Sequence, residues 1–346
     1  MSVPEKINLA PSADQGAGLN LDQKIQNGEI GGAIELWSNP EGLALQDIVF
    51  TLDRTNPITG DPQQDTWITD ETLRQSYAAA AARTDELRGP NTQFQDTNDP
   101  KVTIHEISQE GPKLQIIGRL SRYYVLWGLP GVAEELWKKG INELRKNKRT
   151  EVPLGNSTHN ILLVRNSKTN ETMMVIMAVT GLHGFAAGKL TITCEHQQHP
   201  DRHSRPVDAV VDGFKREFGI EIPEERVRLH KIAAETRSAY VSTIHIADMT
   251  GTLTEEDVNR QWANKVKWRQ GSSLLFVPVS QLEEWKSEDI PYDIWSRKEI
   301  IRHSFPGTLT DQQDYKLHHT GPLRVLAVQE YLNSKKMATL QLATGE

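Results

Sequence analysis

Four side chains of types that bind zinc lie within ten residues of one another in this sequence. They are Cys194, His196, His199 and His203, in the stretch CEHQQHPDRHSRPVDAVVDGFKREFGIEI that runs from residue 194 to residue 222. A structural zinc site takes four nitrogen or sulfur ligands in a tetrahedron, so the residue types fit. The Cys-x-His spacing, however, alternates along an extended chain and does not resemble a zinc-finger knuckle. It favours a polar loop around a small buried cysteine over a closed zinc site.

The second half of this stretch predicts a helix over residues 206–219. PVDAVVDGFKREF is followed by Gly219, a residue that commonly ends helices. A hairpin over 159–179 and a strand over 188–194 precede it, and strands over 226–236, 238–249 and 272–279 follow it. A further helix is expected to begin at Ser280, with that residue as its cap.

This order of elements resembles the Nudix fold, and two segments carry the resemblance. DGFKREFGIEI resembles the end of the Nudix box, which reads Arg-Glu-apolar-x-Glu-Glu-x-Gly-apolar, and LLFVPVSQLEEW resembles the late Nudix strand that enters the closing helix. The similarity covers about residues 157–290. The resemblance implies box glutamates that hold Mg²⁺ or Mn²⁺ against a diphosphate, where the metal activates a water molecule.

Aligned on Gly219, the helix departs from the box at most of its chemical positions. Asp212 replaces the arginine, Gly213 replaces the next glutamate, and Arg216 replaces the first of the paired glutamates. Only Glu217 is kept. Because one carboxylate beside an arginine is a poor divalent site, ordinary Nudix hydrolysis is not expected, and any catalysis would use Glu217 with Asp212.

The resemblance also suggests ligand-contacting and metal-binding residues. Arg216, Lys189 and His159 are the candidates for contact with a ligand. Mg²⁺ or Mn²⁺ at Glu217 is the first metal expectation. Zinc, with Cys194, His196, His199 and His203, is the weaker one.

TITCEHQQHP also resembles a segment of isopentenyl-diphosphate isomerase, which shares the Nudix fold. Cys194 and His196 would match the catalytic cysteine and a metal-binding histidine, and His159 could match another metal-binding histidine. The isomerase's paired glutamates on a later strand are missing, because YVSTIHIADM offers only His245 and Asp248.

These comparisons leave several functions open. The first is a divergent Nudix-like protein that binds a nucleotide- or diphosphate-containing small molecule. The alternative is a catalytically inactive Nudix fold that acts as a ligand sensor or a protein-assembly module. A metal-dependent hydrolase or isomerase with a rebuilt site is a further alternative.

Composition excludes some classes of protein. The 346 residues carry a net charge of −7, which argues against general nucleic-acid binding. The basic cluster over residues 138–149 fits either a phosphate-facing patch or a solvated helix end, and favours the second. A single cysteine, no signal peptide and no membrane-spanning run predict a cytoplasmic protein. A homo-oligomer or a protein partner stays open.

The fold class expected is α+β: a Nudix-like mixed β-sheet sandwiched by helices, with an N-terminal α/β extension and C-terminal helices. The expected boundaries are a flexible arm at 1–30, the extension at 31–150, the Nudix-like domain at 151–290 and a helical segment at 291–346. Within the flanks, helices are expected over 69–89, 131–147, 293–305 and 322–334, and strands over 31–38, 43–52 and 113–130.

Some residues whose side chains could take part in chemistry are expected to lie at the surface. Glu235 and Glu284 could be late Nudix carboxylates but are expected to be solvated, as are His318 and His319 before the last helix. The glycine-rich segment 181–190 borders the ligand cleft in Nudix proteins, but it lacks the pattern of a phosphate-binding loop and is expected to be a flexible connection.

Overall fold

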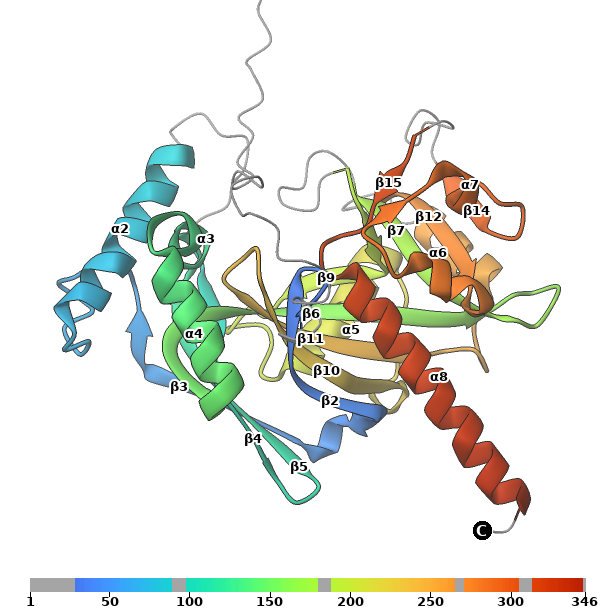
Figure 1. Cartoon of the computed structure of the whole chain (residues 1–346), viewed down its shortest axis with the longest axis horizontal. Coiled ribbons are helices and arrows are strands. Elements are labelled where there is room, and N and C mark those ends of the chain that lie inside the picture. Colours follow the sequence, from blue (N-terminus) through green and yellow to red (C-terminus); the bar gives the residue numbers. More distant parts are fainter. Residues whose placement is uncertain (1–28, 89–97, 180–187, 265–270, 305–312, 345–346) are drawn as a thin grey trace, which may run out of the picture.

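The computed structural model describes residues 29–88, 98–179, 188–264, 271–304 and 313–344. Most of the expected N-terminal arm (1–30) and most of the glycine-rich segment 181–190 lie outside these ranges, and the last two residues of the arm, Glu29 and Ile30, form a short strand. Within them, one large mixed sheet runs through the molecule, and helices lie around it (Figure 1). The expectation of a mixed sheet combined with helices is therefore confirmed.

Thirteen strands of the described residues form this sheet, whose main path has the order β1-β2-β10-β11-β6-β4-β5-β3. β6 pairs in parallel with β11, and β3 pairs in parallel with β5, whereas the other pairs on the path are antiparallel. The strands on the path are β1 (Glu29–Ile30), β2 (Ala33–Ala44), β3 (Ile48–Ile58), β4 (Pro100–Glu110), β5 (Lys113–Arg122), β6 (Arg149–Arg165), β10 (Val227–Glu235) and β11 (Tyr240–Asp248).

A second group of strands branches from β6. β7 joins β6, β8 and β12; β12 continues to β14; and β9 pairs with the middle of β6. These strands are β7 (Thr172–Val179), β8 (Leu190–Ile192), β9 (Cys194–Gln197), β12 (Gly271–Pro278) and β14 (Ile301–Ser304). β13 (Asp289–Ile290) and β15 (Tyr315–Lys316) form a separate pair.

Helices cover both faces of the sheet around β6. Along β6, Leu162 and Val164 pack in the apolar cluster of α5, whereas Ile161 and Leu163 pack in the cluster of α8. Because successive side chains of a strand point to opposite faces, α5 and α8 lie on opposite sides of β6. The helices are α2 (Glu71–Arg88), α3 (Tyr123–Val132), α4 (Glu134–Asn147), α5 (Pro206–Phe218), α6 (Glu255–Asn264), α7 (Tyr292–Trp295) and α8 (Gly321–Thr344), with 3-10 turns η1 (Leu45–Asp47), η3 (Glu224–Arg226) and η4 (Val279–Trp285).

The N-terminal strands belong to the same sheet as the Nudix-like segment. β2 pairs with β10 over most of its length, and β4 pairs with the beginning of β6. The expected boundary at residue 150 falls on the second residue of β6, which begins ten residues before the expected hairpin.

Three expectations about local structure are wrong. The expected strand 113–130 ends at Arg122, and residues 123–132 form α3, because Gly128 lets this apolar segment lie directly against the backbone of Ala80 on α2. No element was expected over residues 100–110, where β4 forms. The expected helix 293–305 consists of α7 and β14, since β14 pairs with β12, so the C-terminal segment is not wholly helical. Ser280 caps no α-helix; its hydroxyl donates to Glu171, and the chain there is η4.

The basic cluster on α4 is largely paired. Lys138 lies 2.7 Å from Glu134, and Lys139 lies 3.7 Å from Glu143. Lys148 ends the helix in the left-handed region and donates to the carbonyl oxygen of Leu36. Among the described residues, none of the helices combines the length and apolar character that a membrane crossing demands.

Candidate functional site

The expected helix over 206–219 is present as α5. Pro206 occupies its first turn, the Asp208 carboxylate accepts from the backbone N–H of Arg205, and Gly219 closes it with a φ of 73°. This left-handed conformation favours glycine, which explains the residue at the end of the helix. Phe214 and Phe218 anchor the helix in the apolar cluster shared with β6 and β7.

Gly213 brings α5 close to the sheet. A Cβ atom at this residue would lie 3.1 Å from Asn160 Nδ2 and 3.4 Å from the His196 ring. Glycine inside a helix costs about 1 kcal/mol relative to alanine, and this close approach accounts for it. A glutamate at this position, as in the Nudix box, would have to displace Asn160 or His196.

Glu217 lies one turn further along and is buried. Burial raises the pKa of the Cys194 thiol, and the Glu217 carboxylate nearby raises it further. Cys194 is therefore a neutral thiol, and Asn160 Nδ2 lies 3.7 Å from its sulfur. Burial also lowers the pKa of His196, which keeps that imidazole neutral. Its Nε2 is buried without a hydrogen-bond partner.

Asp212 faces two basic side chains. His203 Nε2 lies 3.3 Å from its carboxylate, and Arg216 Nη1 lies 3.8 Å from the same oxygen. His203 Nδ1 accepts from the backbone N–H of His199, and His199 Nδ1 accepts from the N–H of Asp201. These histidine nitrogens thus hold the loop before α5 together.

The residues on α5 do not fit the divalent cation that the resemblance implies. A hard cation needs several convergent oxygen ligands, but Arg216 places a positive charge among the candidate carboxylates, and Asp212 is held by His203. In the described ranges, no group of three or more histidine, cysteine, aspartate or glutamate residues is arranged to hold a metal ion.

The three expected ligand-contacting residues are not brought together. Arg216 projects from α5, with 46% of its side chain exposed. His159 is buried on the opposite face of β6, against the start of α8. Lys189 is half-buried at the start of β8, where burial and the nearby Arg237 lower its pKa.

The turn at Thr193 determines which of the following side chains face α5 and which face α8. It lies between β8 and β9 with a φ of 55°, a left-handed conformation that is costly for a β-branched residue. Its hydroxyl accepts from the N–H of Leu162 and donates to the carbonyl oxygen of Val175, which ties β6 to β7. Beyond this turn, Cys194 and His196 face α5, whereas Glu195 faces α8.

A group of buried polar side chains that was not expected lies at the start of α8. Glu235, His318 and His319 are buried, so their assignment to the surface is wrong. They meet there because residues before α8 dock onto the ends of β10 and β9: His319 Nε2 lies 3.0 Å from Glu235, and His318 Nδ1 lies 3.4 Å from Glu195. Glu284, by contrast, is partly exposed and pairs with Arg297.

Arg324 is the cation of this group and is fully buried. Its guanidinium donates to the Glu195 carboxylate, to the Thr191 hydroxyl at 2.8 Å and to the carbonyl oxygen of Ile192 at 3.3 Å. Burial alone would raise the pKa of Glu195, but the charge of Arg324 and the hydrogen bond of Thr191 hold it well below its usual range.

The Glu235 carboxylate accepts hydrogen bonds from serine hydroxyls as well as from histidine. The hydroxyls of Ser238 and Ser242 donate to its two oxygens, and His159 Nε2 lies 3.3 Å from one of them. Burial alone would raise the pKa of Glu235, but the hydrogen bonds of His159 and His319 hold it well below its usual range.

Ser242, His159 and Glu235 do not form a hydrolase triad. In a triad the acid orients the far nitrogen of the histidine, but here Glu235 and Ser242 both lie at Nε2, and Nδ1 faces Thr320. All of these side chains are also buried beneath the start of α8.

The turn between β1 and β2 covers the same group. The N–H of Gly32 donates to the carbonyl oxygen of His319, and a Cβ at Gly32 would lie 2.8 Å from the His319 ring. A Cβ at Gly31 would lie 2.7 Å from that carbonyl oxygen. The two glycines therefore permit the close contact between β1–β2 and the start of α8.

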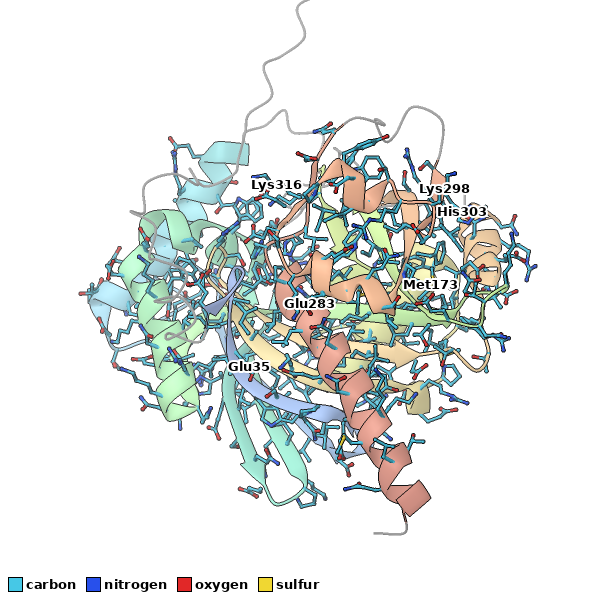
Figure 2. All side chains as sticks on the ribbon, turned by 45° about the vertical axis from the view of Figure 1, so that its right-hand side comes forward. Glu35, Met173, Glu283, Lys298, His303 and Lys316 are labelled. Atoms are coloured by element: carbon cyan, nitrogen blue, oxygen red, sulfur yellow. The ribbon has the colours of Figure 1, made fainter. Side chains whose placement is uncertain are left out.

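Further along, side chains on several elements hold α8, and two of these elements carry the residues Glu35 (β2) and Glu283 (η4) that Figure 2 labels. Lys231 is buried between Glu35 and Glu330, at 2.5 and 2.7 Å, and Gln329 donates to Glu283 at 3.2 Å. Asp248 accepts from Tyr331 and from Lys335, both at 2.7 Å.

Comparisons with known proteins give weak likenesses to Nudix proteins. No protein-family model matches the chain, and no curated protein matches it. Among solved structures, a MutT/nudix family protein from Enterococcus faecalis matches 58% of this chain and 70% of its own, with 13% identity and a TM-score of 0.31. The Nudix domain of Shewanella oneidensis NrtR, solved with ADP-ribose, matches 51% of this chain and 87% of its own, with 7% identity and a TM-score of 0.33. Likenesses at this level do not establish a family for this chain.

Proposed function

We propose that this chain is a Nudix-like protein that binds a phosphate-containing small molecule, such as a nucleotide or another diphosphate, without hydrolysing it by the metal route of Nudix enzymes. The observation that carries the proposal is Arg216, whose guanidinium projects from α5 where the resemblance places a metal-binding glutamate. In a Nudix enzyme a metal ion brings positive charge to the diphosphate. Arg216 supplies a fixed positive charge of its own, and guanidinium groups bind phosphate oxygens well.

The surroundings of Arg216 support binding rather than hydrolysis. Gly213 leaves no carboxylate at the second box position, and contact with Asn160 and His196 leaves little space for one. Asp212 is held by His203, and Glu217 is buried beside the neutral thiol of Cys194. No convergent carboxylates are left on α5 to hold a cation that would activate water.

Calorimetric titration with nucleoside diphosphates and ADP-ribose, with and without Mg²⁺ or Mn²⁺, tests the proposal. We expect binding that needs no metal, and no release of phosphate or nucleotide products. Arg216→Ala should weaken binding by about 10-fold or more, the worth of one hydrogen bond to a charged group. Lys215→Ala is the matched control, because Lys215 is the adjacent cation and pairs with Glu221 away from the site; its affinity should stay within about 2-fold of wild type.

Two results would contradict the proposal. Metal-dependent product formation that is lost in Glu217→Gln would make the chain a hydrolase with a rebuilt site. An absence of binding across the panel would leave the assembly module as the surviving alternative, to be followed by light scattering of the purified chain.

A further inference from the structure

The hydrogen bonds at the start of α8 specify the protonation state of two histidines. The Thr320 hydroxyl lies 2.9 Å from His318 Nδ1, and Nη2 of Arg324, a group that only donates, lies 3.3 Å from it. The backbone N–H of Thr320 points to the same nitrogen at 3.5 Å. His318 Nδ1 therefore has to accept, which requires that it carry no proton.

The hydrogen bonds of Thr320 require that His159 Nδ1 also carry no proton. Its hydroxyl oxygen receives Nε and Nη2 of Arg324, at 3.1 and 2.7 Å, which uses both lone pairs. Its single proton is left for one of two imidazole nitrogens, His318 Nδ1 at 2.9 Å or His159 Nδ1 at 3.1 Å. Neither nitrogen can donate to the hydroxyl oxygen, because both of its lone pairs are used. At its other nitrogen, His159 donates toward Ser242 and Glu235, and the Ser242 hydroxyl donates to Glu235.

The chain of hydrogen bonds from Glu195 through Arg324, Thr320 and His159 to Glu235 is thus complete when His159 and His318 are neutral. A proton on His318 Nδ1 would face the guanidinium of Arg324, and a proton on His159 Nδ1 would face the Thr320 hydroxyl. Either would set two donors against each other in a buried site, which costs the desolvation of an unsatisfied group.

We propose that the start of α8 is an acid-sensitive latch, which docks on the sheet while His159 and His318 are neutral and is released when they become protonated. The latch closes over β6, β8, β9 and β10, and it carries α8 and residues 318–320 with it. It does not depend on what α5 binds.

The other charged groups around His159 and His318 do not reverse the preference of the docked state for neutral imidazoles. Glu195 lies 3.4 Å from His318 Nδ1 and would attract a proton, but the same oxygen already accepts from Thr191 and Arg324. Glu235 and His319 also face the pair, and His245 of β11 acts on His159. Burial lowers the pKa of both His159 and His318, with Arg324 lowering each further.

The sign of the pH effect follows from these pKa directions. Released imidazoles take up protons below about pH 6.5, whereas the docked imidazoles do not, so docking weakens as the pH falls through that value. From pH 7.0 to 5.5 each histidine contributes about 8-fold, and the two together contribute on the order of 70-fold. Carboxylates contribute little here, because they titrate near pH 4 when exposed.

Hydrogen exchange of the full chain at pH 7.0 and 5.5, corrected for intrinsic exchange rates, tests the latch. Protection of amides in residues 321–331 should fall on the order of 70-fold, while that of α4, which contains no histidine, should change by less than about 3-fold. His318→Asn keeps an acceptor oxygen near the Nδ1 position but cannot titrate, so its loss of protection should shrink to about 8-fold.

Several results would overturn the latch. They are unchanged protection of residues 321–331 in the wild type, an equal loss in α4, or a loss in His318→Asn as large as in the wild type. If His318→Asn does not fold, the comparison of α8 with α4 in the wild-type chain decides by itself.

Discussion

Arg324→Leu should destabilise the fold strongly, because it leaves a buried carboxylate without its cation. Arg324 is fully buried, and the side chain of Glu195 is 21% exposed. Loss of one partner of a buried ion pair costs about 3–5 kcal/mol in the free energy of unfolding. Because Arg324 also donates to Thr191 and Thr320, we expect a loss of stability near the upper end of that range.

The double variant Arg324→Leu/Glu195→Leu separates this cost from loss of packing. With both charges removed, no carboxylate is stranded, and the free energy of unfolding should recover by about 2 kcal/mol or more relative to Arg324→Leu alone. Arg297→Leu is the control, since its pair with Glu284 is partly exposed on both sides and should cost less than about 1 kcal/mol.

Urea unfolding at pH 7, followed by both tryptophan fluorescence and circular dichroism, measures these differences, and coincident transitions justify a two-state treatment. A loss of less than about 1 kcal/mol in Arg324→Leu would refute the reasoning. So would a double variant that is no more stable than the single one.

Three further predictions concern other parts of the fold. Gly213→Glu should lower the free energy of unfolding by about 1–3 kcal/mol, because the new side chain meets Asn160 and His196, and it should not create metal-dependent hydrolysis. Urea unfolding and phosphate-release assays measure the two effects, and a gain of turnover would contradict the prediction. Thr193→Val removes the hydroxyl that serves Leu162 and Val175 and should cost about 1–3 kcal/mol in the same urea assay, so an unchanged midpoint would show that the hydroxyl is dispensable. Hydrogen bonds to Asp248 outweigh its burial and lower its pKa to about 2, so about 2 kcal/mol of stability should be present above pH 4 and lost as the pH falls toward 2. In a pH series, the loss of stability between pH 4 and pH 2 should be smaller by about this amount in Asp248→Asn than in the wild type, and equal losses would contradict the prediction.

Local signals in the sequence predicted the elements that end abruptly or alternate regularly. α5 was predictable because Pro206 and Gly219 mark its two ends, and β10, β11 and β12 because their apolar runs are short and bounded by polar turns. α3 was not, because its run of aromatic and aliphatic residues has no helical period and follows a strand directly.

The buried group at α8 could not be predicted in the same way. Glu235 and His319 are 84 residues apart, and Thr320 and His159 are 161 residues apart, so no local pattern relates them. A weak signal does exist in Arg324, a lone cation within the apolar run PLRVLAV, where a charge needs a buried partner. The identity of that partner depends on the turn at Thr193, which directs Glu195 toward α8.

The contact between Gly32 and His319 has a consequence for how the chain is made. β2 finds its partner β10 only after residue 235 has been synthesised, and the turn before β2 meets its partner only after residue 319. During translation, the early strands therefore expose an unpaired edge for most of the synthesis of the chain. Such pairing between distant segments is slow. We expect the fold to close late, with the start of α8 among the last segments to take its place.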